Sequence, residues 1–423
     1  FSTGDSIDYG EISGKVYFQD KENFLVFAYV DNDSINVTKN KPDYITQTGL
    51  DGNYSFKGLS FGKYTLLAVS DEMRNYIYNV GEDKYGVFSN EINISKDKPE
   101  ATNVNFLICT EDTVKPSINS ITMTDRNHIL VEFSEYIDSS KISANNFYIF
   151  DSTANTKNNI KYVFQNSKAK TYFLCLSDSL SVNEENYLIS DSIEDYAGNI
   201  MNHQETFIAL SSARDTIKPK VIKTITDYDD NKIDYQNGNV KLLFNVGINL
   251  EILKDSTEIS DDKGNRVLHS IAKLDDATLN INIIEKTKQK TKYKLKLLTE
   301  NIFDAANNKI DSLYQTSFFT SNELDFSGVS GLIKSNSNIK KVIKIFNKEN
   351  SYSQNISESN KFNFAKVIPG KYLLMIYEDK DSNNLYNYGK AYPYKKSEKF
   401  FVYPDTLNLR ARWPIGDIEI NLD

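Results

Sequence analysis

Hydrophobic and polar residues alternate along much of the chain, which is the pattern of β-strands that are buried on one face. The alternation is clearest in six segments: 12–18, 24–30, 104–108, 130–133, 278–284 and 417–422. Short strands that are separated by turn residues at about every 8–12 positions are typical of β-sandwiches. No long stretch repeats with the helical period, so we predict an all-β fold.

An internal repeat divides the middle of the chain. The segment Asp112-Thr113-Val114-Lys115-Pro116 recurs 103 residues later as Asp215-Thr216-Ile217-Lys218-Pro219. Each copy is followed by a turn rich in Asn or Gly, at 195–199 and at 304–308, shortly before a last alternating segment. Because the proline stiffens the chain and cannot extend a preceding ladder, each copy marks the start of a module. We predict two tandem β modules of about 100 residues.

A second repeat joins the two ends of the chain. Segments 54–56 and 62–67 correspond to 362–364 and 370–375 at an offset of 308, and the match continues to Gly81 and Gly389. The order of modules is therefore A-B-B′-A′. We place A at 11–110, B at 111–213, B′ at 214–322 and A′ at 323–423, which makes a tandem array of four small β-sandwiches.

Composition adds to this picture by exclusion. The 58 Asp and Glu outnumber the 49 Lys and Arg, which argues against a general nucleic-acid binder. No apolar run approaches the roughly 18 residues that a membrane-spanning helix needs. The 27 Tyr and 24 Phe suit pleated, half-buried strands.

Residues that carry chemistry are scarce. The three histidines, at 128, 203 and 269, are isolated in sequence, so we expect surface or turn positions and no zinc site. The two cysteines fall in different modules, so we expect no disulfide, and Cys175 is typical of a small core residue. Nucleophile-elbow, P-loop and zinc-protease motifs are absent from the sequence. We therefore expect a protein that is not an enzyme and that needs no cofactor, calcium excepted.

One segment of A′ has the beginning of a calcium loop. Asp379, Asp381 and Asn383 place oxygen ligands at every second position. The glycine and glutamate that complete such a loop are replaced by Asn384 and Lys390. The equivalent positions of A are Asp71, Met73, Asn75 and Glu82. The alternative is ordinary turn chemistry of Asp and Asn.

Lysines occupy every second position from 286 to 296. If this segment is extended, Lys288, Lys290, Lys292 and Lys294 project from one face and could contact lipopolysaccharide phosphates or an acidic partner. The alternative is a lysine-rich loop and an exposed strand that discourages edge-to-edge pairing.

Tyrosines gather after the repeated motif in A and A′. Tyr386 and Tyr388 lie in loop-like sequence of A′, where such rings suit recognition of a protein or a sugar. Alternatively, they cover an end of the sandwich. We expect Trp413 to be a buried anchor near the last strand.

The B modules resemble the SbsA-type bacterial Ig-like domain. B carries the entry Asp112 to Pro116, the strand end Phe133-Ser134-Glu135-Tyr136-Ile137-Asp138 and the closing turn 195–199 of that pattern. B′ departs from the pattern at 244–247 and 307–308, so its assignment depends on the repeat. The A modules resemble the prealbumin-like, carboxypeptidase-regulatory-like sandwich through the segment 51–64, in which Gly52 makes the turn and Gly62 permits the next reversal.

The opening segment resembles a junction in Ig-like-domain lipoproteins of Bacteroidota. Phe1-Ser2-Thr3-Gly4 is similar to the end of a preceding Ig-like domain, so residues 1–10 are interpreted as its remnant strand and linker. The resemblance implies an exported lipoprotein anchored to the outer membrane by a lipid outside this chain, on the cell surface or the periplasmic face. It also implies a non-catalytic scaffold or interaction subunit that docks on an outer-membrane β-barrel complex. The alternative is a calcium- or carbohydrate-dependent adhesion module.

Overall fold

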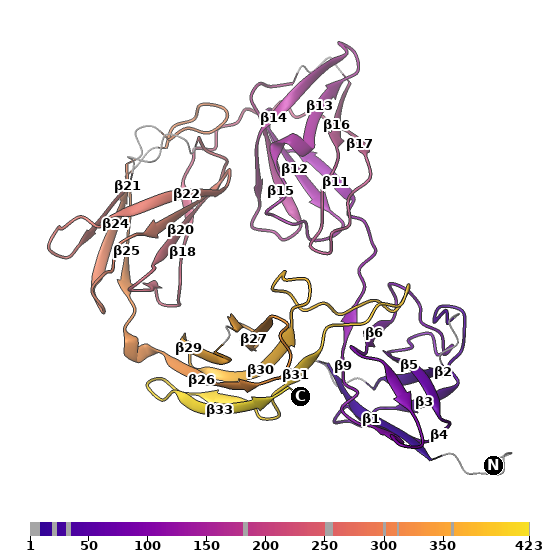
Figure 1. Cartoon of the computed structure of the whole chain (residues 1–423). Coiled ribbons are helices and arrows are strands. Elements are labelled where there is room, and N and C mark those ends of the chain that lie inside the picture. Colours follow the sequence, from indigo (N-terminus) through magenta and orange to yellow (C-terminus); the bar gives the residue numbers. More distant parts are fainter. Residues whose placement is uncertain are drawn as a thin grey trace. The chain divides into compact units, whose positions relative to one another are not determined.

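The computed structural model describes residues 9–18, 23–30, 35–180, 185–249, 257–298, 302–310, 313–356 and 359–422. In this part of the chain the fold is all-β, as predicted, and the helical elements are two 3₁₀ turns, Ala144–Asn146 and Glu323–Asp325. No helix in the described residues is long and apolar enough to cross a membrane. The chain forms two compact units, one of residues 1–112 with 324–423 and one of residues 113–323 (Figure 1). Most of the predicted remnant, residues 1–8, lies outside the described residues.

Module A packs two sheets around one core. The first sheet joins β1 (Gly10–Tyr17), β4 (Asn53–Leu59), β8 (Glu100–Ala101) and β9 (Phe106–Leu107). The second has the order β10 (Cys109–Thr110), β6 (Lys84–Val87), β5 (Gly62–Val69), β2 (Leu25–Val30) and β3 (Tyr44–Gln47), with β7 (Ile92–Ile94) also on β5. Gly52 has φ +82°, and a Cβ there would lie 2.4 Å from the Val16 carbonyl oxygen, so the predicted turn does require glycine. Gly62 has open space around it, so no such requirement exists there.

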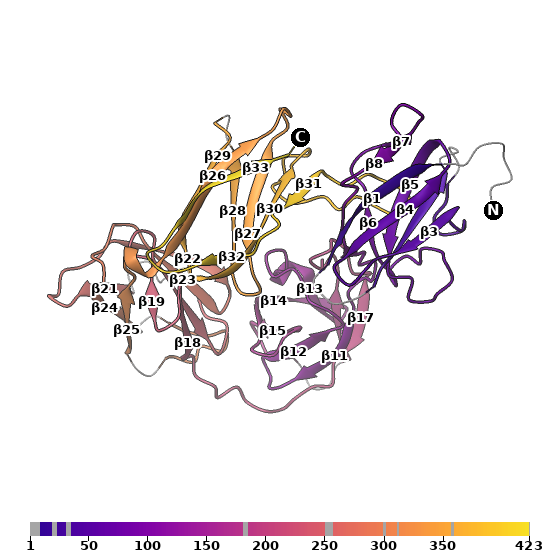
Figure 2. The same ribbon diagram turned by 90° about the horizontal axis from the view of Figure 1, so that it is seen from below.

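Module A′ repeats this topology (Figure 2). One sheet contains β26 (Ser327–Lys334), β29 (Lys361–Val367) and β33 (Ile415–Asn421). The other has the order β28 (Ser351–Ile356), β27 (Lys341–Phe346), β30 (Gly370–Glu378) and β31 (Phe400–Val402), with β32 (Leu407–Leu409) on β30.

The two end modules differ by an insertion. On β5, Val69 pairs with Tyr85 of β6; on β30, Tyr377 pairs with Phe400 of β31. The first residues of these pairs are 308 apart and the second are 315 apart. A′ therefore holds seven extra residues between Gly389 and β31, a difference that the sequence repeat alone did not reveal.

Module B is a sandwich whose strands form one continuous path. The order is β11 (Ile118–Met123), β12 (His128–Phe133), β15 (Thr171–Leu176), β14 (Thr156–Gln165), β13 (Phe147–Asp151), β16 (Asn186–Ser190) and β17 (Gln204–Phe207). The long β14 pairs with β15 through its second half and with β13 through its first half. It thus connects the two layers that enclose the core.

Module B′ has the same arrangement without that connection. One sheet has the order β18 (Val221–Thr226), β20 (Asn239–Phe244), β23 (Thr278–Ile283) and β22 (His269–Asp275). The other has the order β19 (Lys232–Ile233), β25 (Tyr314–Thr320), β24 (Lys292–Leu297) and β21 (Thr257–Asp261). The two sheets form separate layers in Figure 1. Cys175 of B is fully buried in the same cluster as the core of B′, and both cysteines are free thiols.

Candidate functional site

The predicted calcium segment of A′ forms a tight turn directly after β30. Asp379 is buried, and its two carboxylate oxygens accept hydrogen bonds from the backbone amides of Asn383 and Asn384, each at 3.1 Å. The Lys340 ammonium lies 2.9 Å from the same carboxylate. Burial alone would raise the pKa of Asp379, but the hydrogen bonds from Lys340 and from these amides outweigh it and lower the pKa.

Two further carboxylates complete the cluster. Oxygens of Asp379, Asp381 and Glu398 all lie within 4.8 Å of one another. Glu398 is buried and accepts the amide of Lys380 at 2.6 Å and the amide of Asn387 at 2.9 Å. The Asp-x-Asp spacing found two members but missed Glu398, because Glu398 follows the insertion.

Asn383, the third predicted ligand, has another role. Its side-chain nitrogen donates to Asp381 at 3.0 Å, and its Oδ1 accepts the amide of Leu385 at 2.6 Å. The amide oxygen is thus used within the turn. A cation here would be held by three carboxylates, and the Lys340 ammonium already supplies positive charge beside Asp379.

Module A builds the same turn without the third carboxylate. Asp71 accepts the amide of Asn75 at 3.0 Å, and Asp83 accepts the amides of Glu72 at 2.8 Å and Asn79 at 2.7 Å. Asp83 thus does in A what Glu398 does in A′, whereas the glutamate expected from loop spacing, Glu82, is exposed. Since the turn forms in A with Met73 in place of Asp381, the turn itself does not require a cation.

The predicted tyrosines of A′ lie beside this cluster. The Tyr386 hydroxyl donates to the Glu398 carbonyl at 3.1 Å, and its ring packs on those of Tyr377, Tyr388 and Phe400 at 4.8–5.7 Å. Burial raises the pKa of Tyr386. Tyr388 keeps 37% of its surface exposed. The position of Tyr386 corresponds to the alternative in which these rings cover the sandwich.

The insertion of A′ packs on module A. Ala391 is fully buried in a cluster with Phe27, Tyr85 and other residues of A. The Tyr85 hydroxyl donates to the Gly389 carbonyl at 3.0 Å, and the Ser397 hydroxyl donates to the Val87 carbonyl at 2.9 Å. An ion pair, Lys396 with Glu91 at 3.0 Å, lies at the rim. The seven extra residues therefore join the two ends of the chain into one unit.

Trp413 is not the buried anchor that we expected. It is 74% exposed, and its backbone makes the hydrogen bonds: the carbonyl accepts the Ser327 hydroxyl and the amide donates to the Arg410 carbonyl, each at 3.0 Å. The nearby turn, in which Arg410 bridges to Trp413, leaves the indole in solvent.

The lysine segment is a loop followed by a strand. Lys288 and Lys290 lie in the loop, where Lys290 has φ +54°, and Lys292, Lys294 and Lys296 lie on β24. The loop and the strand are those of the second alternative, but β24 is paired on both sides, with β25 and β21, so its lysines do not protect a sheet edge. The residues between them, Tyr293, Leu295 and Leu297, are buried in the core. The strand lysines therefore project from the outer face of the sheet.

Three other strands of the sheet, β19, β21 and β25, extend this basic face. Lys292 pairs with Phe319 of β25, which pairs in turn with Lys232 of β19. Lys294 lies between Ser317 and Ser260, and Lys296 lies between Gln315 and Glu258. Phe319 is 44% exposed, and the Lys292 ammonium lies 5.9 Å from its ring centroid. We call the residues that project outward here, with Arg266 at the sheet edge, the basic face of B′; its members are Lys232, Glu258, Ser260, Arg266, Lys292, Lys294, Lys296, Gln315, Ser317 and Phe319.

Module B carries different chemistry at the equivalent positions. Phe150, Tyr187 and Phe207 form one row across β13, β16 and β17, where B′ has Ser260, Lys294 and Ser317. The rings of Tyr187 and Phe207 meet edge to face with centroids 5.8 Å apart, and Phe207 is 57% exposed. We call this row the aromatic face of B.

One histidine prediction was wrong. His128 is buried, and its Nδ1 lies 2.9 Å and 3.0 Å from the two carboxylate oxygens of Asp125 and 3.9 Å from Asp215 of the linker that follows B. Burial would lower the pKa of His128, but its hydrogen bonds with Asp125 raise it to about 11. Sequence spacing missed this group because the linker returns to β12 only in the fold.

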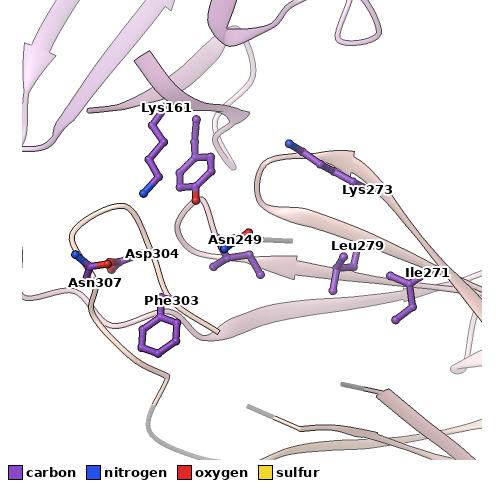
Figure 3. A pocket seen from close by; sticks show the side chains of 10 residues that line it. Lys161, Asn249, Ile271, Lys273, Leu279, Phe303, Asp304 and Asn307 are labelled. Atoms are coloured by element: carbon purple, nitrogen blue, oxygen red, sulfur yellow. The ribbon is translucent and has the colours of Figure 1, made fainter. Parts of the chain in front are cut away.

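A cleft of about 580 Å³ lies where B meets B′. Figure 3 shows Lys161 pointing toward the turn that carries Asp304 and Asn307. Asp304 is occupied as acceptor from Asn308, and Lys273 is paired with Asp276, which accepts the Val163 amide at 2.6 Å. The described residues that line the cleft include one carboxylate, that of Asp304, and no His, Cys or Ser. Of these contacts, the hydrogen bond from the Val163 amide to Asp276 joins the two modules.

One family match places B′ among known domains. Residues 215–320 match a family described as bacterial Ig-like domain. This is the module whose motifs depart from the expected pattern, and the shared strand order of B and B′ supports the same fold in B. No curated protein matches the chain.

Solved structures give weak likenesses. The N-terminal part of the bacterial S-layer protein SbsC is 15% identical, with 49% of this chain and 45% of that chain covered and a TM-score of 0.22. Four immunoglobulin domains of Sidekick-1 are 8% identical, with coverage of 88% and 90% and a TM-score of 0.23. The major pilin subunit BcpA of Bacillus cereus is 9% identical, with coverage of 99% and 100% and a TM-score of 0.17. The chain spans less than half of the S-layer chains it matches, and likeness at these TM-scores supports no statement about this chain. What the comparisons establish is a bacterial Ig-like domain within an array of β-sandwich modules.

Proposed function

We propose that this chain is a non-catalytic, multi-module protein of the cell envelope that acts as a scaffold or interaction subunit. The observation that carries the proposal is the bacterial Ig-like domain at residues 215–320, set in an array of similar sandwiches. Sandwiches of this kind are common in cell-surface proteins, where outer sheet faces and loops present binding residues on a rigid core.

The use of the polar groups also supports a non-catalytic role. Buried carboxylates such as Asp83, Asp379 and Glu398 accept backbone amides in turns, and Asp304 closes a turn of the same kind. A carboxylate that is used in this way stabilises a loop and is not available to move a proton. The groups brought together in the described modules thus support a structural and binding function.

A finer proposal follows from the resemblance of the sequence. It is an exported lipoprotein of Bacteroidota, anchored to the outer membrane through a lipid outside this chain and docked on a β-barrel complex. The test is affinity capture of the full-length protein from detergent-solubilised outer membranes. A β-barrel protein recovered in stoichiometric amount is the expected result. Recovery of the protein alone, or from the cytosolic fraction, contradicts the proposal.

The second candidate is a calcium-dependent adhesion module, which the cluster of Asp379, Asp381 and Glu398 favours. Adding about 1 mM calcium should then raise the melting temperature, and Asp381→Asn should remove the increase. Asp381 is exposed, so the variant should fold. Asp405→Asn, an exposed aspartate elsewhere in A′, is the matched control. An unchanged melting temperature with calcium removes this candidate.

A further inference from the structure

We propose that the basic face of B′ is a docking surface for the anionic headgroups of a lipid surface. The proposal deepens the proposed function by giving one module a ligand class, and it rests on the proposed location in the cell envelope. The occupant follows from the charge and the exposed ring of the face.

The charges of this face are largely uncompensated. Its one carboxylate, Glu258, pairs with Arg266 at 2.6 Å. Lys232, Lys294 and Lys296 make no ion pair within the described part of the chain. Lys288 and Lys290 extend the positive charge into the adjoining loop, where the Lys288 ammonium is 3.9 Å from Asp261.

The acidic balance of the whole chain does not oppose this surface. Residues 1–213 carry 17 Lys and Arg against 30 Asp and Glu, whereas residues 214–423 carry 32 against 28. The net negative charge therefore comes from the first half of the chain. An anionic lipid surface attracts a local cluster of basic residues over a distance of about a Debye length, so the distribution of charge decides binding more than the total does.

The geometry fits a lipid surface better than an acidic protein. Successive lysines of β24 lie about 6.6–6.8 Å apart along a paired strand, so their charges form an evenly spaced row, and Lys232 lies two strands away on β19. Phe319, 44% exposed between Lys232 and Lys292, supplies an apolar ring that can enter the headgroup region while the ammonium groups contact phosphates.

The fold does not require these lysines. Module B has the same strand pairing, and its aromatic face bears Phe150 and Tyr187 where B′ has Ser260 and Lys294. An outer face of this sheet can therefore be built with quite different side chains. The basic residues of B′ accordingly point to a ligand and not to a structural need.

The test is binding of the purified chain to vesicles of phosphatidylcholine, alone or mixed with phosphatidylglycerol, at physiological salt. The native chain should bind the mixed vesicles only. The triple variant Lys292→Gln, Lys294→Gln and Lys296→Gln should lose about 100-fold in partition coefficient, about fivefold for each lysine. The control, Lys220→Gln, Lys223→Gln and Lys241→Gln, removes three exposed lysines elsewhere in B′ and should bind like the native chain.

Several outcomes would overturn the proposal. These are equal binding by the triple variant and the native chain, equal binding to both kinds of vesicle, or no binding to either kind. Competition by inorganic phosphate would overturn it as well, since that result indicates a site for the free ion. An unchanged unfolding midpoint of the triple variant shows that it is folded. The capture experiment above uses detergent extracts without a bilayer, so the two proposals can fail independently.

Discussion

Modules B and B′ share a strand order and differ on the outer face of one sheet. Their inner faces are alike: Ile149 and Leu188 of B and Ile259 and Leu295 of B′ are each at most 1% exposed. Their outer faces are opposite in chemistry, aromatic in B and basic in B′. The comparison teaches that the repeat preserves the side chains that enclose the core, while the exposed side of the same strands is open to different ligands.

A second difference lies at the end of the first hairpin. In B, Asp125 bonds the imidazole of His128; in B′, Asp227 accepts the amide of Asn239 and its side-chain nitrogen at 2.8 Å and 3.2 Å. A carboxylate near the end of this hairpin thus holds an ionisable partner in B and a neutral one in B′. Module B should therefore lose stability at alkaline pH through His128, whereas B′ has the neutral Asn239 at the equivalent position.

The largest expected loss of stability comes from the buried inner faces that B and B′ share. Leu188→Ala in B and Leu295→Ala in B′ each remove a fully buried side chain and should each lower the free energy of unfolding by about 2–5 kcal/mol. Urea denaturation of unit 113–323 within the full chain measures both. A loss below about 1 kcal/mol in either module would show that the two inner faces are not equivalent.

A smaller loss of stability should distinguish the turn at Asp195 of B from the turn at Asp304 of B′. Asp195 accepts three hydrogen bonds, from the amides of Ala197 and Asn199 and from the Asn199 side chain; Asp304 accepts two, both from Asn308. Replacing either aspartate by alanine should cost about 1–3 kcal/mol, and more in B than in B′. Thermal unfolding of the two variants provides the measurement. The reverse order would contradict this account of the turns.

The pH dependence of the free energy of unfolding should come from module B. Because the pKa of His128 is raised from its ordinary 6.5 to about 11, the native state binds a proton that the unfolded state releases, so the stabilisation is complete below pH 6.5 and is lost as pH rises toward 11. The free energy of unfolding should fall by about 1 kcal/mol per pH unit above pH 7. His128→Asn, which gives B the residue of B′, should flatten this slope. An equal slope in the variant would assign the effect to Asp215 or Cys175, which also face His128.

The smallest effect on stability is expected at the outer faces. Lys294→Ala should change the free energy of unfolding by less than about 0.5 kcal/mol, because the side chain is exposed and unpaired with any described carboxylate. Phe207→Ala should cost about 1 kcal/mol, because its ring meets Tyr187. A large loss in the lysine variant would mean that the basic face has a structural role.

The sequence predicted the fold class because alternation and repeats report directly on buried faces. Fewer of the residues that come together in the candidate sites could be predicted. The turn of A′ needs Glu398, which an insertion moves away from its repeat position, and the insertion itself contacts A through Ala391. His128 meets Asp215 only after the linker returns to the hairpin. Lys232 joins the basic face by strand pairing across 87 residues, which no local spacing contains.

Binding to anionic vesicles as a function of salt tests the central claim most directly. If the basic face of B′ is the docking surface, the partition coefficient of the native chain should fall steeply as salt rises, and the variant without Lys292, Lys294 and Lys296 should show weak binding with a much smaller slope. Binding that is independent of salt, or a slope equal in both proteins, would contradict the assignment of function to this face.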